Sequence, residues 1–544
     1  MIYIVIGLAV VVAVIIAMKY SKARSLQRML FRIRKQFGSV PDREFILKNV
    51  QYLVDCEEKK YDIDEITWND LDMDKVYSRI NNCNSFVGEQ VLYRQLHSLE
   101  HKGKETETRE NLIQGFMDDT KRREDVQLMF EGLGRHRNSY YLPQFIKEID
   151  MFKLSNIWIY RILTILLGTT LVLGIFNQYF LYACGAIFLI NLVIYTLGKY
   201  RFEFHLGMLG SVVDVVVTAN TLIKKYNINE SDLAKESILS AERMSKTVNR
   251  IAIIQRKMET GMIGDIGALI FNYLIGSTLW DFHIFHKIVT MLTIHQEEFM
   301  KLYNYIGEID AAISIASYRE SIPYYCKPVF QKDKTIYFEE MYHPLINEPV
   351  SNDVDMKSNY IVTGSNASGK STYIKAIAIN MILAQSINMT LAKSANIPYA
   401  NVLTSMAVRD DVTSGESYYM REIKYLKRII TQLKEDKLTL CIVDEILRGT
   451  NTEERIAASV AILNYIYTRN CLAIVASHDI EISERLGKKF MNCHFSEAIN
   501  KKDIYFDYKV KEGVSKSKNA IKLLRHVGFP KEIVKSAEEL VLKL

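Results

Sequence analysis

The stretch Gly364–Thr372, with the sequence GSNASGKST, decides how the C-terminal part of the chain folds. It follows the apolar run Tyr360–Thr363 and precedes a segment whose apolar residues recur with helical spacing, at Ile374, Ile377 and Met381. A strand, a glycine-rich loop and a helix in this order are the setting of a phosphate-binding loop. We therefore predict an α/β domain with a nucleotide site at Gly364–Thr372, which we call the phosphate loop.

The residue types of the phosphate loop suit a nucleotide triphosphate and its metal ion. Its glycines allow backbone N–H groups to curl around phosphates, and the N-terminus of the following helix adds partial positive charge. Lys370 is expected to reach the β and γ oxygens, and Ser371 to offer its hydroxyl to Mg²⁺. The predicted cofactors are ATP and Mg²⁺.

Two further apolar strands lead into polar residues that would complete such a site. Leu440–Val443 is followed by Asp444 and Glu445, and buried parallel strands deliver such carboxylates to one edge of a sheet. Asp444 would hold Mg²⁺ and its water, while Glu445 would polarise the attacking water. Leu472–Ala476 is closely followed by His478, a candidate sensor of the γ-phosphate; the alternative is a purely structural histidine.

The composition limits the classes of function without choosing one. A chain of 544 residues should hold several domains, because single cores stop growing at about 250–300 residues. The net charge of +6 is compatible with nucleic acid or lipid headgroups, but equally with ordinary membrane topology signals. The seven cysteines are scattered without a C-x-x-C pair, which predicts free thiols in a reducing compartment and neither a zinc site nor a disulfide framework.

The N-terminal apolar run Ile2–Met18 predicts a membrane anchor. It is followed by a stretch rich in basic residues, from Lys19 to Lys35. A cleaved signal peptide would carry its positive charge before the apolar run, so the observed order favours an uncleaved helix with its N-terminus outside the cytoplasm.

A second apolar region predicts a transmembrane helical hairpin. Ile162–Phe176 and Tyr179–Leu197 are each close to the length that spans a bilayer, and basic residues flank the pair. Both feet of the hairpin would lie in the cytoplasm, as would the phosphate loop; the alternative is a buried hairpin of a soluble domain. The shorter run Ile266–Trp280 is predicted to be a core helix. The expected location is the inner (cytoplasmic) membrane, with several spans.

At these motifs the chain resembles the MutS family of DNA mismatch-repair ATPases, members of the ABC superfamily. Besides the phosphate loop, the similar segments are, in order, HPLINEPVSND (His343–Asp353), RDDVTSGESYYMREI (Arg409–Ile423), VDEILRGTNTEERIAASVAIL (Val443–Leu463), IVASHDIEIS (Ile474–Ser483) and the C-terminal stretch Lys509–Val541. The resemblance implies an α/β P-loop ATPase domain of the ABC type, an all-α MutS-like core domain and, in this variant, transmembrane helices.

The resemblance also implies roles for individual residues. Lys370, Glu445 and His478 would be catalytic, and Ser371 and Asp444 would hold the metal. The nucleotide would be bound by the whole loop and by the adenine-holding segment, that is by Gly364, Ser365, Asn366, Ala367, Ser368, Gly369, Lys370, Ser371, Thr372 and Val350. Ser417 would be presented across a dimer interface to the partner's nucleotide, so that a homodimer forms composite sites; the alternative is an ordinary residue at a helix N-terminus.

Fainter similarity at Asp70–His97 and Ile306–Phe330 implies a helical core that is split around the hairpin. The family's mismatch-reading domain is expected to be missing before Asp70. The predicted division is an anchor (1–20), a basic juxtamembrane helical segment (21–64), the first part of the core (65–153), the hairpin (154–200), the remaining core with lever helices (201–325) and the ATPase domain with C-terminal helices (326–544).

The expected function is a membrane-anchored ATPase that binds and hydrolyses ATP in a dimeric composite site, coupled to binding of duplex or mismatched DNA as in mismatch repair. The alternative is a nucleotide-switched membrane scaffold that recruits unknown protein partners without recognising mismatches. A transporter half is disfavoured, because an anchor and one hairpin give too few spans. In either main hypothesis, release of the dimer interface on hydrolysis would rotate the helical core and reach the hairpin.

Overall fold

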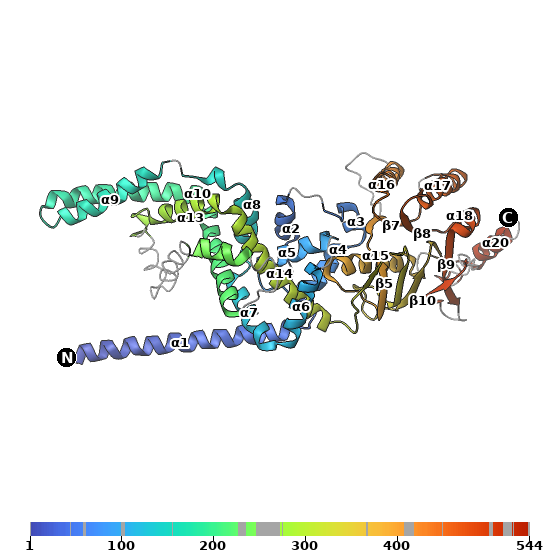
Figure 1. The fold of residues 1–544 in the computed structure, drawn as a ribbon, viewed down its shortest axis with the longest axis horizontal. Coiled ribbons are helices and arrows are strands. Elements are labelled where there is room, and N and C mark those ends of the chain that lie inside the picture. The colour runs from blue at the N-terminus through green and yellow to red at the C-terminus, as the bar shows by residue number, and fades with distance from the viewer. Residues whose placement is uncertain are drawn as a thin grey trace. The chain divides into compact units, whose positions relative to one another are not determined.

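The computed structural model describes residues 2–43, 45–57, 61–99, 104–154, 156–226, 236–245, 248, 273–274, 276–365, 368–406, 418–448, 450–499, 504–514, 525 and 527–541. The chain divides into two compact units (Figure 1). The helical unit comprises residues 1–59, 80–94 and 103–321, and the α/β unit comprises residues 60–79, 95–102 and 322–544. The predicted division into six parts is finer than this and stays a prediction.

Within its described residues, the helical unit consists of helices and their connections. They are α1 (Ile2–Gln36), α2 (Leu47–Cys56), most of α5 (Phe86–His97), α6 (Lys104–Asp118), α7 (Thr120–Leu133), η1 (Arg137–Tyr141), α8 (Leu142–Lys147), η2 (Ile149–Phe152), α9 (Ile157–Leu173), α10 (Gln178–Tyr226), α13 (Trp280–Ile294) and α14 (Gln296–Glu320). Helices from both sides of the hairpin pack together, since α14 contacts α6 and α10 contacts α7. The core of this unit is therefore assembled from distant parts of the chain.

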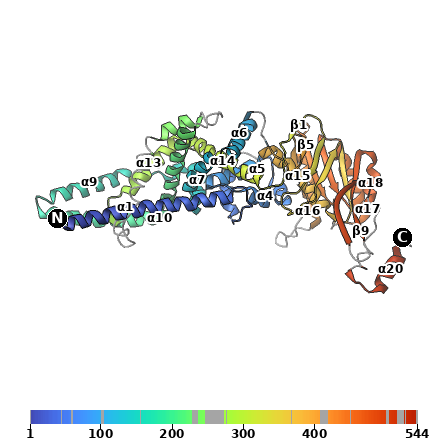
Figure 2. The same ribbon diagram turned by 90° about the horizontal axis from the view of Figure 1, so that it is seen from below.

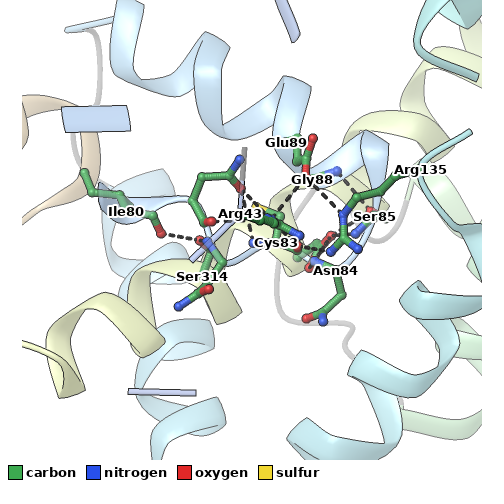
Figure 3. Close-up of polar contacts among 12 residues, drawn as sticks. Arg43, Ile80, Cys83, Asn84, Ser85, Gly88, Glu89, Arg135 and Ser314 are labelled. Atoms are coloured by element: carbon green, nitrogen blue, oxygen red, sulfur yellow. Dashed lines mark hydrogen bonds and ion pairs between the residues drawn. The ribbon is translucent and has the colours of Figure 1, made fainter. Parts of the chain in front are cut away.

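A buried polar cluster joins α5 to α14 within the helical unit (Figure 3). The fully buried Asp310 of α14 accepts hydrogen bonds from Asn84 N at 2.9 Å, from Ser85 N at 2.8 Å and from Ser85 Oγ at 2.6 Å. These donors precede α5, so the carboxylate satisfies backbone groups that the helix cannot pair internally. Burial raises the pKa of Asp310 to about 6 against the effect of these donors. Arg43 and Arg135 each lie 3.1 Å from the buried Glu89 beside it.

The predicted apolar hairpin forms two antiparallel helices that project from the helical unit (Figures 1 and 2). Among the described residues, two helical segments are long and apolar enough to cross a membrane, Ile149–Leu173 and Tyr179–Gly198, and they are only 6% and 11% buried. A hairpin in the core of a soluble domain would be mostly covered, and this one is not. Placement in a membrane stays a prediction, and most of the predicted core helix Ile266–Trp280 lies outside the described residues.

The α/β unit is built around a sheet of order β10-β9-β4-β8-β7-β6. Its strands are β4 (Asn359–Thr363), β6 (Asn401–Ser405), β7 (Thr439–Asp444), β8 (Cys471–Ala476), β9 (Phe490–Ile499) and β10 (Ile504–Glu512). The five strands from β9 to β6 pair in parallel, and β10 pairs antiparallel with β9. A second sheet of order β1-β5-β2-β3 contains β1 (Val329–Gln331), β2 (Ile336–Met341), β3 (Asn352–Met356) and β5 (Ser394–Pro398).

Helices cover the parallel sheet because its strands are apolar on both faces. Alternate residues such as Ile361, Cys441 and Val475 pack against α16 (Tyr418–Gln432), α17 (Thr452–Tyr467) and α18 (Ile480–Leu486). The nearly fully buried α15 (Lys370–Ile387) contacts β6, β7 and β8. The remaining elements of this unit are α3 (Glu65–Asp70), α4 (Met73–Ile80, of which Ile80 is assigned to the helical unit), η5 (Gly487–Lys489) and α20 (Lys531–Val541).

The strand order brings the predicted site residues to one edge of the sheet. β8 lies between β4 and β7, with Val362 beside Ala476 and Asp444 also beside Ala476. The phosphate loop follows β4, Glu445 follows β7 and His478 follows β8, so all three emerge at the carboxyl ends of adjacent parallel strands. This edge is where open α/β sheets bind ligands.

Candidate active site

The phosphate loop has a conformation that needs its glycines. Gly364 has φ +140° and Gly369 has φ +101°, a region that favours glycine. A Cβ at Gly364 would lie 3.0 Å from the carbonyl oxygen of Phe495, and one at Gly369 would lie 3.1 Å from Tyr508 Cδ1. The loop therefore lies tightly against β9 and β10. Asn366 and Ala367, predicted to contact the nucleotide, lie outside the described residues.

Lys370, the first residue of α15, is turned back across the loop. The residue is only 1% exposed, and its ammonium donates a hydrogen bond to the carbonyl oxygen of Gly364. Lys370 Nζ also lies 3.5 Å from Nε2 of His478. Close by, the hydroxyl of Ser365 is buried without a hydrogen-bond partner among the described atoms. A cation and an orphaned hydroxyl on one loop fit an anionic ligand such as phosphate.

Ser371 and Asp444 meet although 73 positions separate them in the chain. Ser371 Oγ donates a hydrogen bond to Asp444 Oδ2 at 2.6 Å. A hydroxyl and a carboxylate are the hard oxygen ligands that Mg²⁺ prefers, and Mg²⁺ at phosphate sites usually takes one or two protein oxygens with waters and phosphates. These two residues fit the predicted metal ion.

Glu445 is held as an anion next to His478. Oε1 of Glu445 lies 2.8 Å from His478 Nε2, and the guanidinium of Arg448 forms an ion pair with the same carboxylate. Burial alone would raise the pKa of Glu445, but the contact with His478 and the positive charges of Arg448 and Lys370 outweigh burial and lower it. The group is thus a carboxylate at neutral pH, ready to accept a proton or orient a water molecule.

The backbone at Glu445 is itself unusual. Glu445 has φ +56° and Leu447 has the same value, both in the left-handed region. Such conformations cost on the order of 1–3 kcal/mol for residues other than glycine and persist where the surroundings impose them, often at functional sites. This conformation turns the chain away from β7 directly after Asp444. The carboxylate of Asp444 therefore contacts Ser371, whereas that of Glu445 contacts His478.

A cavity of about 440 Å³ opens beside the phosphate loop. Its lining includes His343, Val350, Gly369, Thr372, Phe495 and Tyr508. Burial, followed by the charge of Lys375, lowers the pKa of His343 to about 4 despite the opposing charge of Asp72. Apolar and aromatic walls with a neutral imidazole suit the heteroaromatic base of a nucleotide.

The sequence motifs do not predict two aromatic residues that line this cavity, Phe495 and Tyr508. Phe495 lies on β9, and Tyr508 lies at an irregularity of β10, where the register with β9 shifts between Phe506 and Val510. Tyr508 has φ +51°, and nothing in the local sequence announces this bulge. Val350 was predicted and does line the cavity, whereas Ser417 lies outside the described residues. The described residues contain no cluster of three or more His, Cys, Asp or Glu side chains that could hold a metal ion.

Comparison with known proteins gives this geometry a family context. Residues 360–544 match the model of MutS domain V. The DNA mismatch repair protein MutS of Petrotoga mobilis is 30% identical over 279 residues, covering 48% of this chain and 33% of that protein. Its namesakes from Staphylococcus epidermidis and Thermotoga maritima are each 28% identical, over 271 and 274 residues, covering 47% of this chain and 31% and 33% of those proteins.

The domain match lies in the C-terminal part of the chain, and each of these relatives matches 47–48% of the chain. The chain spans about one third of the length of the curated relatives it matches. Together with the mixed α/β sheets, the matches support a relationship to the MutS family and a MutS-like α/β core.

Proposed function

We propose that the α/β unit binds ATP with Mg²⁺ and hydrolyses it. The observation that carries this proposal is the convergence of Lys370, Ser371, Asp444, Glu445 and His478 at the carboxyl ends of three adjacent strands. A cation, a pair of oxygen ligands and a carboxylate held as an anion are the parts that phosphoryl transfer to water requires.

Each residue then has one task. Lys370 exchanges its hydrogen bond to Gly364 for the β and γ oxygens, while the backbone of the phosphate loop positions the triphosphate. Ser371 and Asp444 would hold the metal ion, which would supply positive charge to stabilise the transferred phosphoryl group. Glu445 orients the attacking water and draws its proton, and His478, in contact with both Glu445 and Lys370, monitors the γ-phosphate.

The wider proposal follows from the relatives, which are named as DNA mismatch repair proteins. We infer that the chain forms homodimers with composite sites, in which Ser417 serves the partner's nucleotide, and that ATP turnover is coupled to duplex DNA. The exposed apolar hairpin favours a location in the cytoplasmic membrane, with the α/β unit in the cytoplasm. It also favours, as a second candidate, a membrane scaffold that recruits protein partners without DNA.

Hydrolysis is tested with Glu445→Gln in the purified full chain. General-base assistance contributes about 10²–10⁴-fold, so kcat for ATP should fall by that range while nucleotide affinity stays within about threefold. Glu453→Gln, an exposed carboxylate on the first turn of α17, is the matched control and should keep full turnover. Unchanged turnover in Glu445→Gln would remove the assignment of this residue.

The two candidate functions differ in their response to salt. If DNA is the partner, binding of duplex by the full chain must weaken steeply between about 50 and 200 mM salt, because phosphate contacts release counterions. Binding should also depend on ATP. A chain that turns over ATP but shows no salt-dependent duplex binding would favour the scaffold.

A further inference from the structure

We propose that the basic stretch of α1 between Lys19 and Arg28 binds the headgroups of anionic phospholipids. This inference rests on the membrane location proposed above and adds a lipid class to it. The stretch follows directly after the apolar run that ends at Met18, within one uninterrupted helix. A basic segment in that place lies at the level of the headgroups when the apolar run lies in the hydrocarbon.

The charges of this stretch are exposed and available. The sequence contains no acidic residue before Asp42. The side chains of Lys19, Arg24 and Arg28 are exposed, and within the described part of the chain no ion pair involves them. Lys19 and Arg28 lie about 14 Å apart along the helix axis, at 1.5 Å per residue. This length is comparable to the distance of roughly 10 Å over which surface charge acts at moderate salt.

The next basic residues along α1 have a different role, because they are paired within the helical unit. Arg34 donates from Nε and Nη2 to the two oxygens of Glu124 on α7, both at 2.7 Å, and Arg32 lies 2.9 Å from Glu131. A boundary therefore exists along α1: Arg32 and Arg34 attach the helix to α7, whereas Lys19, Arg24 and Arg28 have no such partner among the described residues.

The same helix α7 also holds α10, whose first part is an arm of the hairpin. Asp125, next to Glu124, lies 3.3 Å from Lys225 Nζ and accepts a hydrogen bond from the Tyr226 hydroxyl at 3.1 Å. With α1 and α10 both attached to α7, the N-terminal part of α1 and the hairpin extend toward the same end of the helical unit (Figures 1 and 2). The apolar run of α1 and the hairpin could therefore enter the same membrane, with the basic stretch of α1 at its cytoplasmic surface.

Nucleic acid is the competing anionic partner for a basic stretch. The position next to the apolar run favours lipid, because a duplex bound there would have to approach within a few residues of the bilayer. The exposed apolar side chains of the hairpin, such as Ile165, Phe176 and Leu189, favour the same surroundings.

The test uses the purified full chain in a neutral detergent. One variant combines Lys19→Gln, Arg24→Gln and Arg28→Gln, and the matched control combines Lys332→Gln, Lys334→Gln and Lys488→Gln, three exposed lysines of the α/β unit. Both variants lose three positive charges. Binding of dihexanoyl phosphatidylglycerol is compared with that of dihexanoyl phosphatidylcholine by calorimetric titration, at low and high salt.

The unaltered chain and the control should bind phosphatidylglycerol at least tenfold more tightly than phosphatidylcholine, and high salt should reduce the difference. The variant of α1 should lose that preference. Equal binding of both lipids by the unaltered chain, or an unchanged preference in the α1 variant, would overturn the inference. Loss of duplex oligonucleotide binding in the α1 variant with lipid binding intact would also overturn it, in favour of nucleic acid.

A separate readout distinguishes this inference from the membrane proposal itself. Cell membranes containing the chain are washed with alkaline carbonate, which removes peripheral proteins. Release of the unaltered chain would overturn the membrane location and the lipid inference together. Retention of the chain combined with no lipid preference would overturn the lipid inference alone.

Discussion

Gly88→Ala tests whether the polar cluster around Asp310 fixes α5 to α14. A Cβ at Gly88 would lie 2.2 Å from Asp310 Oδ2 and 2.6 Å from its Cβ, about 1.2 and 0.8 Å closer than an ordinary contact of 3.4 Å. Asp310 cannot withdraw by this distance and keep its bonds to Asn84 N, Ser85 N and Ser85 Oγ, which are 2.6–2.9 Å long.

The expected cost combines two effects. Overpacking of a tight site costs about 1–3 kcal/mol, and hydrogen bonds to a charged group contribute about 1.5–3 kcal/mol each. The higher helix propensity of alanine relative to glycine offsets at most about 1 kcal/mol of this loss. If the substitution breaks one of the bonds to Asp310, we expect the helical unit to lose roughly 2–5 kcal/mol of unfolding free energy.

The assay is hydrogen exchange of the α5 and α14 amides in the full chain, because a chain of several units need not unfold in one step. Protection should drop by at least tenfold in both helices together. Gly115→Ala in α6 is the matched control: its Cβ would have no neighbour within 4 Å, so protection there should rise or stay unchanged. Equal protection in Gly88→Ala and the unaltered chain, or loss confined to α5, would refute the reasoning.

The remaining predictions concern the active site. Asp444→Asn should weaken Mg²⁺-dependent ATP binding by about 10–100-fold without changing binding in EDTA, because an amide is a poorer ligand for a hard cation; equal loss in both conditions would contradict a metal role. Tyr508→Ala should weaken ATP binding by about tenfold with kcat at saturation unchanged, since stacking on a base contributes about 1–3 kcal/mol, whereas the exposed Tyr465→Ala should change neither value. In the folded chain His343 has a pKa of about 4 and stays neutral above that pH, whereas in the unfolded chain it gains a proton below about pH 6.5. Lowering the pH from 6.5 to 4 should therefore reduce the unfolding free energy of the α/β unit. This pH dependence of the unfolding free energy should be smaller in His343→Gln, and an identical dependence would contradict the reasoning.

The site was predictable where chemistry is carried by short motifs on strands. The phosphate loop follows β4, and Asp444 ends β7, because apolar runs that end in polar residues form buried parallel strands whose carboxyl ends share one edge. The pairing of Ser371 with Asp444 follows from this rule. The rule applies only if β4 and β7 belong to the same sheet, and the family resemblance implies that they do.

Other features depend on contacts between distant segments and leave no local signal. Asp70, at the start of the segment that resembles the family's helical core, lies in the α/β unit, where its Oδ2 accepts hydrogen bonds from Thr404 Oγ1 at 2.7 Å and Met406 N at 2.9 Å. Tyr508 reaches the cavity through a bulge in β10. More than 300 positions separate Asp70 from its partners, so periodicity and turn residues cannot predict this pairing.

The attachment of α1 and α10 to α7 bears on how nucleotide turnover could reach a membrane. The uninterrupted α10 extends from the hairpin to Tyr226, a length of about 70 Å at 1.5 Å per residue, so movement of one end displaces the other. The ion pairs that join it and α1 to α7 are partly exposed, and exposed pairs contribute little to stability. They orient the two helices, while α10 is held in place by buried apolar residues such as Val212, Val216 and Leu222. A rotation of the helical core that supplies a coupling free energy of about 1–3 kcal/mol could change these contacts while the buried cluster around Asp310 stays intact. In the proposed cycle, α7 would be the element through which such a rotation reaches both the anchor and the hairpin.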